Sequence, residues 1–473
     1  MDQTRSAFCD PLSAALKHAL DHLAPARELS VAATASLESL RAKLCFSLPE
    51  AGTDGARVVD ELVSGVAGGI INSAGPRFFG WVIGGSLPAA LAADWLTSAW
   101  DQNAGLYACS PAAAIVEEAA GQWLKELLHL PATASFALVT GAQMAHVTCL
   151  AAARHALLAK QGIDVETDGL SGSPAIRILT STEKHGTIVR AVRLLGLGEK
   201  NLISLQSDAD GRLPAESLTN ALQEDSTIPT VVVLQAGDLS IGAFDDFQTL
   251  IPIAKKHGAW VHIDGAFGLW AAASARYRHL LAGAGQADSW TTDGHKWLNV
   301  PYDCGYAFVA DREAHRASLS HRAAYLTHDA DARDQLDWTP EYSRRGRGFA
   351  TYAALRQLGK AGVEALIDRT CGHAHALVTR MGSLPGAEML WEPQINQGLI
   401  RFHDPRNGAT DTDHDAFTDR IMAAILASGE AFFTGTTWRG RRAMRVSVCN
   451  WQTSTEDVER VIKCVARTLE AAR

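Results

Sequence analysis

The sequence predicts an α/β protein, with a mostly parallel seven-stranded sheet in a large domain and a smaller α+β domain at the carboxyl terminus. Two observations support this prediction. From about Ser135, short strand-like runs alternate with helical stretches, which is typical of a parallel sheet covered by helices on both faces. After Arg347 the pattern changes to a long helix, a mixed segment with strands and a final helix.

The expected strands are short apolar runs, most of them bounded by turn-forming residues. They cover residues 136–140, 176–180, 202–205, 230–235, 260–263, 289–291 and 306–309. The expected helices between them carry apolar residues at helical spacing. They cover residues 144–160, 187–195, 214–223 and 247–257. Further along, we expect a long helix from residue 349, strands near 398–402 and 444–448, and a helix at 455–471.

The first segment is predicted to be an amphipathic helix, because Leu12, Leu16, Leu20 and Leu23 recur at helical spacing. Such a stripe needs an apolar partner surface. That surface could belong to a second subunit or to the same domain, and the sequence favours neither. We divide the chain into an N-terminal helical segment (1–78) that packs on a partner subunit, a large domain (79–348) and a small C-terminal domain (349–473).

The composition is that of an ordinary globular protein, with 473 residues, 47% hydrophobic and 20% charged. A net charge of −9 argues against a nucleic-acid surface, which needs clustered Lys and Arg. The eight cysteines form no close pair, so neither a zinc site nor a disulfide framework is indicated, and a reducing cytoplasm fits. No secretory signal is apparent, and the longest uncharged run, 127–153, is interrupted by polar residues, so no membrane span is predicted.

A lysine and an aspartate each follow a predicted strand, where α/β sheets bind their ligands. Lys296 lies in the sequence TTDGHKW, and Asp264 lies in VHIDGA. A lysine amine can carry the aldehyde of pyridoxal phosphate as a Schiff base, while a carboxylate keeps the pyridine nitrogen protonated. Taken singly, each residue also fits a duller interpretation, a solvated surface lysine or a turn. The pair predicts a pyridoxal phosphate site.

Two further turns between a strand and a helix are candidates for cofactor contacts. Gly141, Ala142 and Gln143 could offer backbone N–H groups and a helix N-terminus to a phosphate, although such a turn is often only structural. His185 could stack its flat ring on a cofactor, or it could cap the following helix. The pairs His262-x-Asp264 and His373-x-His375 are poor metal sites, so no metal is predicted.

In chain order, the segments TGAQMAH, EKHGTIVRAVR, VHIDGAF, TTDGHKWLNVPYDCG and PEYSRRGRGFATYAALRQLG resemble the group II pyridoxal-phosphate-dependent amino-acid decarboxylases of fold-type I. This family includes aromatic-L-amino-acid, glutamate and diaminobutyrate decarboxylases. The resemblance runs from about Pro76 to the carboxyl terminus.

The resemblance implies roles for the residues at the cofactor. Lys296 would bind the cofactor aldehyde, Asp264 would pair with the pyridine nitrogen, Ala266 would pack under the ring and His185 would stack above it. The phosphate would be held by Gly141, Ala142 and Gln143, and His295 would lie at the cofactor and at the pocket wall.

The resemblance also implies a homodimer with shared active sites. Tyr325 matches a family tyrosine that reaches the active site from the partner subunit and is proposed to protonate the substrate carbon. The acidic stretch 327–335 behind it suits a loop that opens and closes. Ser343 matches a position at which the second subunit completes the phosphate site.

Several positions depart from the family pattern. Relatives often have Asn-Pro where this chain has Asp293-Gly294, and an acidic side chain beside a phosphate would repel it unless it is turned away or protonated. Asp238 stands where a Thr or Asn is common, and it could face a cationic substrate group or only water. Gly84 lacks a hydroxyl found in some aromatic-amino-acid enzymes. Trp81, in the same substrate-lining segment, could stack on an aromatic side chain or belong to the core.

These expectations lead to α-decarboxylation of an L-amino acid, with a weak preference for aromatic substrates. Two alternatives stay open. The same cofactor could serve aldol cleavage, transamination or oxidative deamination, and Arg445 could anchor a carboxylate in such a reaction or form a structural ion pair. The protein could also be a non-catalytic homologue that has kept the cofactor site.

Overall fold

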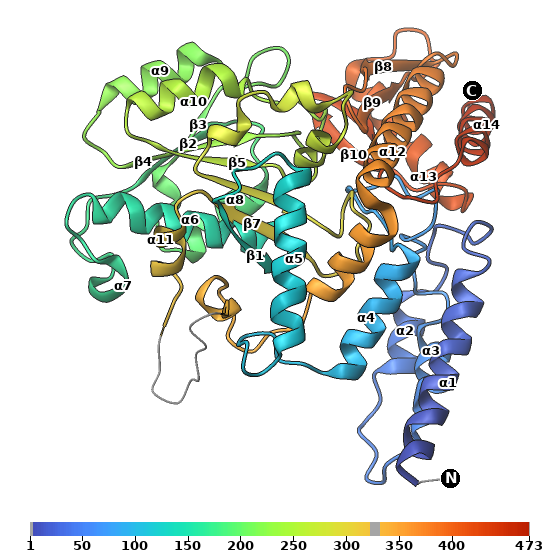
Figure 1. The fold of residues 1–473 in the computed structure, drawn as a ribbon. Helices are drawn as coiled ribbons and strands as arrows, with labels where there is room; N and C mark the ends of the chain where they lie inside the picture. The colour runs from blue at the N-terminus through green and yellow to red at the C-terminus, as the bar shows by residue number, and fades with distance from the viewer. Residues whose placement is uncertain (1–2, 322–331, 473) are drawn as a thin grey trace.

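The computed structural model describes residues 3–321 and 332–472, which form an α/β large domain, a smaller α+β domain and a group of N-terminal helices (Figure 1). The large domain contains a seven-stranded sheet, and the small domain a four-stranded sheet. The predicted fold class is therefore confirmed. None of the described helices is both long and apolar enough to cross a membrane.

The large sheet has the strand order β1-β7-β6-β5-β4-β2-β3. β7 is antiparallel to both of its neighbours, β1 and β6, and the other pairs are parallel. Its strands are β1 (Ser135–Val139), β2 (Arg177–Ser181), β3 (Leu202–Leu205), β4 (Thr230–Gln235), β5 (Trp260–Asp264), β6 (Ser289–Asp293) and β7 (Gly305–Val309). These bounds lie within two residues of the predicted ones. The carboxyl ends of the parallel strands meet along one edge of the sheet.

The two faces of this sheet are covered by different helices, because alternate residues of a strand point to opposite faces. Val231 and Val233 pack in one apolar cluster with α6 (Ala142–Ala159) and α8 (Gly186–Leu194). Val232 and Leu234 pack in another with α9 (Ala215–Glu224) and α10 (Phe247–Lys256). Both faces are therefore buried, which explains why the strands are almost continuously apolar.

The small domain packs two helices and part of a long one around its own sheet, of strand order β10-β11-β9-β8. The long helix α12 (Gly348–Gly382) is kinked at Gly359, whose φ is 61°. The other elements are β8 (Ala387–Trp391), β9 (Gln397–Phe402), α13 (Asp411–Ala427), β10 (Thr434–Trp438), β11 (Arg441–Ser447) and α14 (Thr455–Ala471). The predictions for β9 and α14 agree with these bounds to within one residue, and that for β11 overlaps it but starts three residues late, whereas β8, β10 and α13 were not predicted.

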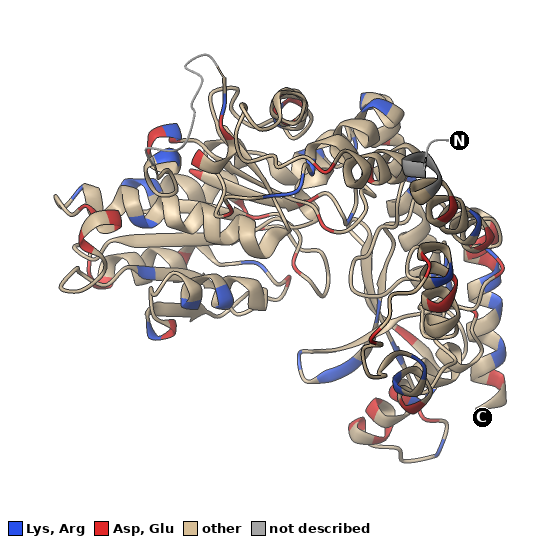
Figure 2. Cartoon of the chain, turned by 90° about the horizontal axis from the view of Figure 1, so that it is seen from below, with Lys and Arg blue, Asp and Glu red and all other residues tan. Residues whose placement is uncertain are grey.

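The N-terminal helices α1 (Gln3–Leu23), α2 (Leu37–Leu44) and α3 (Gly55–Val66) project from the body of the chain, and α4 (Pro88–Trp100) leads back to it (Figure 1). Leu12 and Leu20 of α1 are more than half exposed. Leu16, Leu20 and Leu23 line a groove of about 650 Å³ together with Trp95 of α4. The predicted leucine stripe is therefore not covered by its own chain. Elsewhere, charges of both signs are interspersed along the helices (Figure 2).

A buried ion pair ties the segment before α12 to the large domain. Arg344 donates to Glu117 of α5 (Pro111–Leu127) at 2.6 Å, and both side chains are fully buried. The same guanidinium donates to the carbonyl oxygens of Ala104 at 3.0 Å and Leu138 at 2.6 Å. Arg344 thereby links the carboxyl half of β1 to the chain that enters the small domain.

Replacing Arg344 with Met is expected to lower the free energy of unfolding by about 3–5 kcal/mol, because Glu117 then remains buried without its partner. Arg345→Met is the matched control, since Arg345 pairs with Asp94 at the surface, where such pairs contribute less than about 1 kcal/mol. Urea denaturation of both variants measures the difference. Equal losses would contradict a specific role for the buried pair.

Candidate active site

Gly141, His185, Asp264 and Lys296 follow or end four strands of the sheet and lie along its carboxyl edge. Gly141 follows β1, His185 follows β2, Asp264 ends β5 and Lys296 follows β6. Parallel strands present such positions at one edge, where α/β proteins bind ligands. β5 and β6 are neighbours in the sheet, and both His185 and Lys296 lower the pKa of Asp264, so these three side chains lie near one another.

Lys296 is held from two sides. Its Nζ lies 3.1 Å from Oδ2 of Asp293, and its side chain is 22% exposed. Its carbonyl oxygen lies so close to Gly84 that a Cβ atom at position 84 would overlap it. The absence of a side chain at Gly84 therefore lets the 78–84 segment pack directly on the lysine backbone. This contact gives a steric reason for the missing hydroxyl.

Asp264 is a buried carboxylate that stays ionised. Burial by itself raises its pKa, but the nearby His146, His185 and Lys296 more than reverse this effect, so the pKa lies below its usual range. One of its oxygens also accepts a hydrogen bond from the Ala266 N–H at 3.1 Å. A carboxylate of this kind can hold a proton on a neighbouring pyridine nitrogen, as the sequence predicts.

A chain of hydrogen bonds leads from Trp260 to His146, whose ring lies beside Asp264. The Trp260 indole N–H donates to Ser289 Oγ at 2.9 Å, and Ser289 Oγ lies 2.9 Å from Nδ1 of His262. Nε2 of His262 lies 2.9 Å from Nδ1 of His146, whose Nε2 lies 3.5 Å from Oδ2 of Asp264.

The indole can only donate, so Ser289 has its own hydrogen free for His262. Burial, first of all, and the neighbouring His146 lower the pKa of His262 to about 3, so its ring is neutral. If Ser289 donates to Nδ1 of His262, then Nε2–H of His262 donates to His146, and Nε2–H of His146 points at Asp264. The whole chain then directs hydrogens toward the carboxylate.

His185 is compatible with both interpretations that the sequence left open, capping of the following helix and stacking on a cofactor. It is the N-cap residue of α8, and its Nδ1 accepts the Thr187 N–H at 3.2 Å and lies 2.8 Å from the Thr187 hydroxyl oxygen. Burial lowers its pKa, with Asp264 opposing and Lys296 reinforcing the shift. The cap thus fixes the orientation of a half-buried ring, and the ring remains available for stacking.

The turn at Gly141 opens helix α6, and its N-cap has no side-chain hydrogen bond. A side chain at Gly305 of β7 would overlap the backbone of Gly141, so the strand and the turn touch directly. Gln143 is turned toward α8, because its Nε2 donates to the Thr187 carbonyl oxygen at 3.3 Å. The Ala142 N–H, however, already donates to Oδ1 of Asp293 at 2.6 Å.

His295 precedes the lysine, and Trp81 lies in the segment whose Gly84 packs on the lysine backbone. His295 stacks on Tyr302, with ring centroids 4.3 Å apart, and its Nδ1 accepts the Cys304 N–H at 3.2 Å. Trp81 is 53% exposed and packs against Phe432 with centroids 5.0 Å apart. Trp81 is therefore not a core residue of this chain, and its ring can serve as a pocket wall.

The expectation that Asp238 faces a substrate group or water is wrong. Its carboxylate is buried and accepts three backbone N–H groups, from Ser240 at 2.8 Å, Ile241 at 3.2 Å and Ala243 at 2.7 Å. Asp238 therefore stabilises its own turn, a common use of aspartate at such positions. Arg445 is also buried, and it donates to the Leu239 carbonyl oxygen at 2.9 Å instead of forming an ion pair among the described residues.

Two residues, Tyr325 and Ser343, are expected to act on the active site of the partner subunit. Tyr325 and most of the 327–335 stretch lie outside the described residues, so the role of Tyr325 stays a prediction. The last residue of that stretch, Gln335, is buried in a short 3₁₀ helix. Ser343 is exposed, and its hydroxyl lies 3.5 Å from Nδ2 of Asn103. Its role at the phosphate of a second subunit also stays a prediction.

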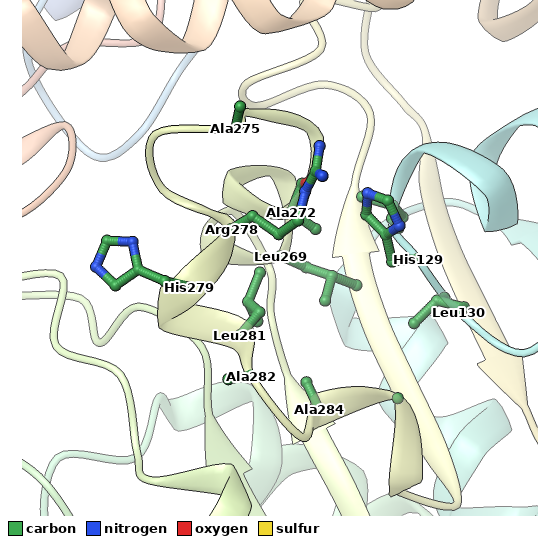
Figure 3. Close-up of a pocket in the computed structure, with 12 residues that line it drawn as sticks. His129, Leu130, Leu269, Ala272, Ala275, Arg278, His279, Leu281, Ala282 and Ala284 are labelled. Atoms are coloured by element: carbon green, nitrogen blue, oxygen red, sulfur yellow. The ribbon is translucent and has the colours of Figure 1, made fainter.

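A separate cavity of about 530 Å³ lies between the end of α5 and the short helices at 268–286 (Figure 3). It has basic side chains, but Arg278 donates to the Ala272 carbonyl oxygen and His279 contacts that of Arg276. None of the predicted site residues lines it. Among residues 3–321 and 332–472, no group of three or more His, Cys, Asp or Glu side chains could hold a metal ion.

Sequence reasoning missed His146 and Ser289 as members of the site. One available signal was the spacing of His262 and Asp264. Residues two apart on a strand lie on the same face of the sheet, so this spacing predicts His262 on the face that carries Asp264. The segment TGAQMAH also places His146 within the helix that follows the turn at Gly141. Whether His146 meets His262 depends on how α6 crosses the sheet.

Comparisons with known proteins agree with this geometry. The model of the pyridoxal-dependent decarboxylase conserved domain matches residues 38–403. L-2,4-diaminobutyrate decarboxylase of Rhizobium meliloti (strain 1021) is 29% identical over 386 residues, covering 80% of this chain and 75% of that protein. Aromatic-L-amino-acid decarboxylase of Bacillus atrophaeus is 25% identical over 450 residues, covering 94% and 91%. The crystal structure of Oryza sativa TDC with PLP and tryptamine has a TM-score of 0.91 at 25% identity, covering 99% and 98%.

Replacing Gly84 with Ala is expected to push the Lys296 backbone away, since the added methyl group overlaps its carbonyl oxygen. Overpacking of this kind costs about 1–3 kcal/mol, so the affinity for pyridoxal phosphate should fall roughly fivefold to 150-fold. Absorbance titration with the cofactor measures the change. Gly372→Ala in α12, where a Cβ atom meets nothing within 4 Å, is the control and should bind normally. Unchanged affinity in Gly84→Ala would refute the steric argument.

Proposed function

We propose that this chain, which belongs to the pyridoxal-dependent decarboxylase family, removes the α-carboxylate of an L-amino acid as carbon dioxide and leaves an amine. The observation that carries this proposal is the convergence of Lys296, ionised Asp264 and His185 at one edge of the sheet. These are the groups that pyridoxal phosphate, the cofactor of this family, requires at its aldehyde, its ring nitrogen and its ring face.

When bound, the cofactor supplies an electron sink for the bond that breaks. The residues of the chain supply position and charge. Lys296 would bind the aldehyde, and Asp264 would hold a proton at the pyridine nitrogen, which requires the carboxylate to stay ionised. His146, which is hydrogen-bonded to His262, lies 3.5 Å from that carboxylate and supports it. His185, with its Nδ1 fixed by Thr187, would cover the ring.

The phosphate would lie at the N-terminus of α6, where the backbone N–H groups of Ala142 and Gln143 and the helix dipole favour an anion. Tyr325 of a second subunit would deliver a proton to the substrate carbon after carbon dioxide leaves. This proton transfer decides whether the product is the amine. Product analysis therefore distinguishes decarboxylation from aldol cleavage, transamination or oxidative deamination with the same cofactor.

We propose an aromatic substrate, in keeping with the exposed rings of Trp81 and Tyr302. Trp81 lies in the segment that packs on the lysine backbone, and Tyr302 stacks on His295 and is 59% exposed. Aromatic walls favour aromatic side chains through offset stacking. The B. atrophaeus relative carries the name of an aromatic-L-amino-acid decarboxylase, whereas the R. meliloti relative is named for diaminobutyrate.

The purified protein with pyridoxal phosphate is expected to release carbon dioxide and amine in equal amounts from at least one aromatic L-amino acid. A panel of aromatic, acidic and basic L-amino acids, assayed for both products, tests this expectation. Lys296→Ala should abolish turnover and borohydride trapping of the cofactor, while Lys360→Ala, at an exposed lysine, should change neither. Aldehyde without amine would favour oxidative deamination, and no product from any substrate would favour a non-catalytic homologue.

The exposed leucines of α1 and the groove between α1 and α4 support a homodimer in which each subunit covers the other's N-terminal helices. A stripe of this size is rarely left exposed in a monomer. The exposed position of Ser343 is also compatible with a contact across the two-fold axis. Shared sites follow if Tyr325 and Ser343 act on the neighbouring subunit.

Shared sites predict that two inactive variants restore each other. Lys296→Ala and Tyr325→Phe should each form little amine alone, because each lacks a group that every site needs. Random pairing of the two should restore about a quarter of wild-type activity, since half of the dimers then have one complete site. Co-expression with two affinity tags and an amine assay on the mixture measures this. Mixtures no more active than their parents would exclude sites shared in this way.

A further inference from the structure

Asp293 brings a second carboxylate into the cofactor site, and its position bears on how the proposed cofactor is held. The side chain is 2% exposed at the end of β6. Its Oδ1 accepts the Ala142 N–H at 2.6 Å. Its Oδ2 lies 3.1 Å from Nζ of Lys296 and 3.7 Å from Nε2 of His295. The carboxylate thus contacts both the amide that opens α6 and the lysine.

The same amide is a donor that a phosphate at the N-terminus of α6 would use. A phosphate monoester carries about −1.5 to −2 charges at pH 7. A carboxylate within hydrogen-bond distance of that position opposes the phosphate, because like charges repel strongly where water is excluded. The protein therefore offers the cofactor a phosphate site that already contains an anionic side chain.

Asp293 cannot easily move away from this position. Its backbone N–H donates to the Ala266 carbonyl oxygen at 2.9 Å, and its own carbonyl oxygen accepts the Trp270 indole N–H at 3.0 Å. The β6–β7 pairing places it opposite Gly305, and a Cβ atom there would lie 2.9 Å from Oδ1. The backbone of Asp293 is therefore fixed, and in this conformation its buried carboxylate lies where a phosphate at the N-terminus of α6 would bind.

We propose that Asp293 competes with the phosphate group of pyridoxal phosphate for the amide that opens α6, so that the phosphate contributes little to cofactor affinity. The inference rests on the proposed function. The cofactor is then held mainly at its ring and through Lys296, and it exchanges more readily than it would from a site with a neutral residue at position 293.

The ion pair with Lys296 is a second effect of the same carboxylate, and it must be separated from the first. Removing the charge of Asp293 also removes the ion-pair partner of Lys296, the residue that reacts with the aldehyde. The loss of this ion pair should change the affinities for pyridoxal phosphate and for pyridoxal equally, because pyridoxal has the same aldehyde and ring but no phosphate. The ratio of the two dissociation constants therefore isolates the phosphate contribution.

The test is an absorbance titration of the wild-type protein, Asp293→Asn and Asp303→Asn with pyridoxal phosphate and with pyridoxal. Asp303→Asn makes the same change at an exposed aspartate nearby, which pairs with Arg347. In Asp293→Asn, the preference for pyridoxal phosphate over pyridoxal should increase at least about tenfold, equivalent to about 1.4 kcal/mol. In Asp303→Asn it should stay within about twofold of wild type.

An unchanged or smaller preference in Asp293→Asn would overturn the proposal. The wild-type ratio tests it without any variant, since the proposal expects the two ligands to bind within about tenfold of each other, and a preference of about 1,000-fold would also overturn it. If neither ligand binds to the wild-type protein or is trapped there by borohydride, the proposed function itself fails. If both bind with the ratio unaffected by Asp293→Asn, only this inference fails.

Discussion

The site depends on keeping the Asp264 carboxylate ionised in a place where burial favours its neutral form. A buried carboxylate without partners takes up a proton. Here His146, His185 and Lys296 outweigh burial, so the pKa of Asp264 falls below its usual value. Without that negative charge, a pyridine nitrogen would not hold its proton, and the ring would withdraw electrons poorly. The three partners come from α6, from the cap of α8 and from the segment after β6, so several elements of the large domain share this task.

A second constraint is that backbone segments touch without intervening side chains. Gly84 packs on the Lys296 carbonyl group, and Gly305 packs on the turn at Gly141. The latter contact follows from the sheet, because β7 runs antiparallel between β1 and β6 and therefore starts beside the turn at Gly141 that follows β1. The glycines therefore fix the distances between the lysine, the turn and the sheet edge, which a flexible packing of side chains would not do.

Much of the fold could be predicted from the sequence because the strands are buried on both faces and helices separate most of them. The edge strands β8 and β10 were missed, since they are partly exposed and their residues, such as Thr434–Trp438, give no continuous apolar run. The positions of Lys296, Asp264 and His185 at strand ends also follow from the pattern. The role of Asp238 did not, because a buried carboxylate at a turn gives the same sequence signal as one at a substrate.

The contacts of Asp293 and His146 could not be predicted for a different reason. Each depends on how a helix crosses the sheet, which fixes whether a side chain of α6 or an amide at its start meets a residue from β5 or β6. The doubt about Asp293 could be stated from sequence, since an acid near a phosphate is unfavourable, but its hydrogen bond to Ala142 and its pairing with Lys296 required coordinates.

The two carboxylates of the site act on opposite ends of the cofactor proposed here. Asp264 would act on the ring nitrogen, where charge controls reactivity, and Asp293 would act at the phosphate, where charge controls retention. Interactions at separate positions without shared partners contribute nearly additively. Lys296, however, is a shared neighbour of both. Changes at Asp264 and Asp293 are therefore expected to be coupled through Lys296 and not simply additive.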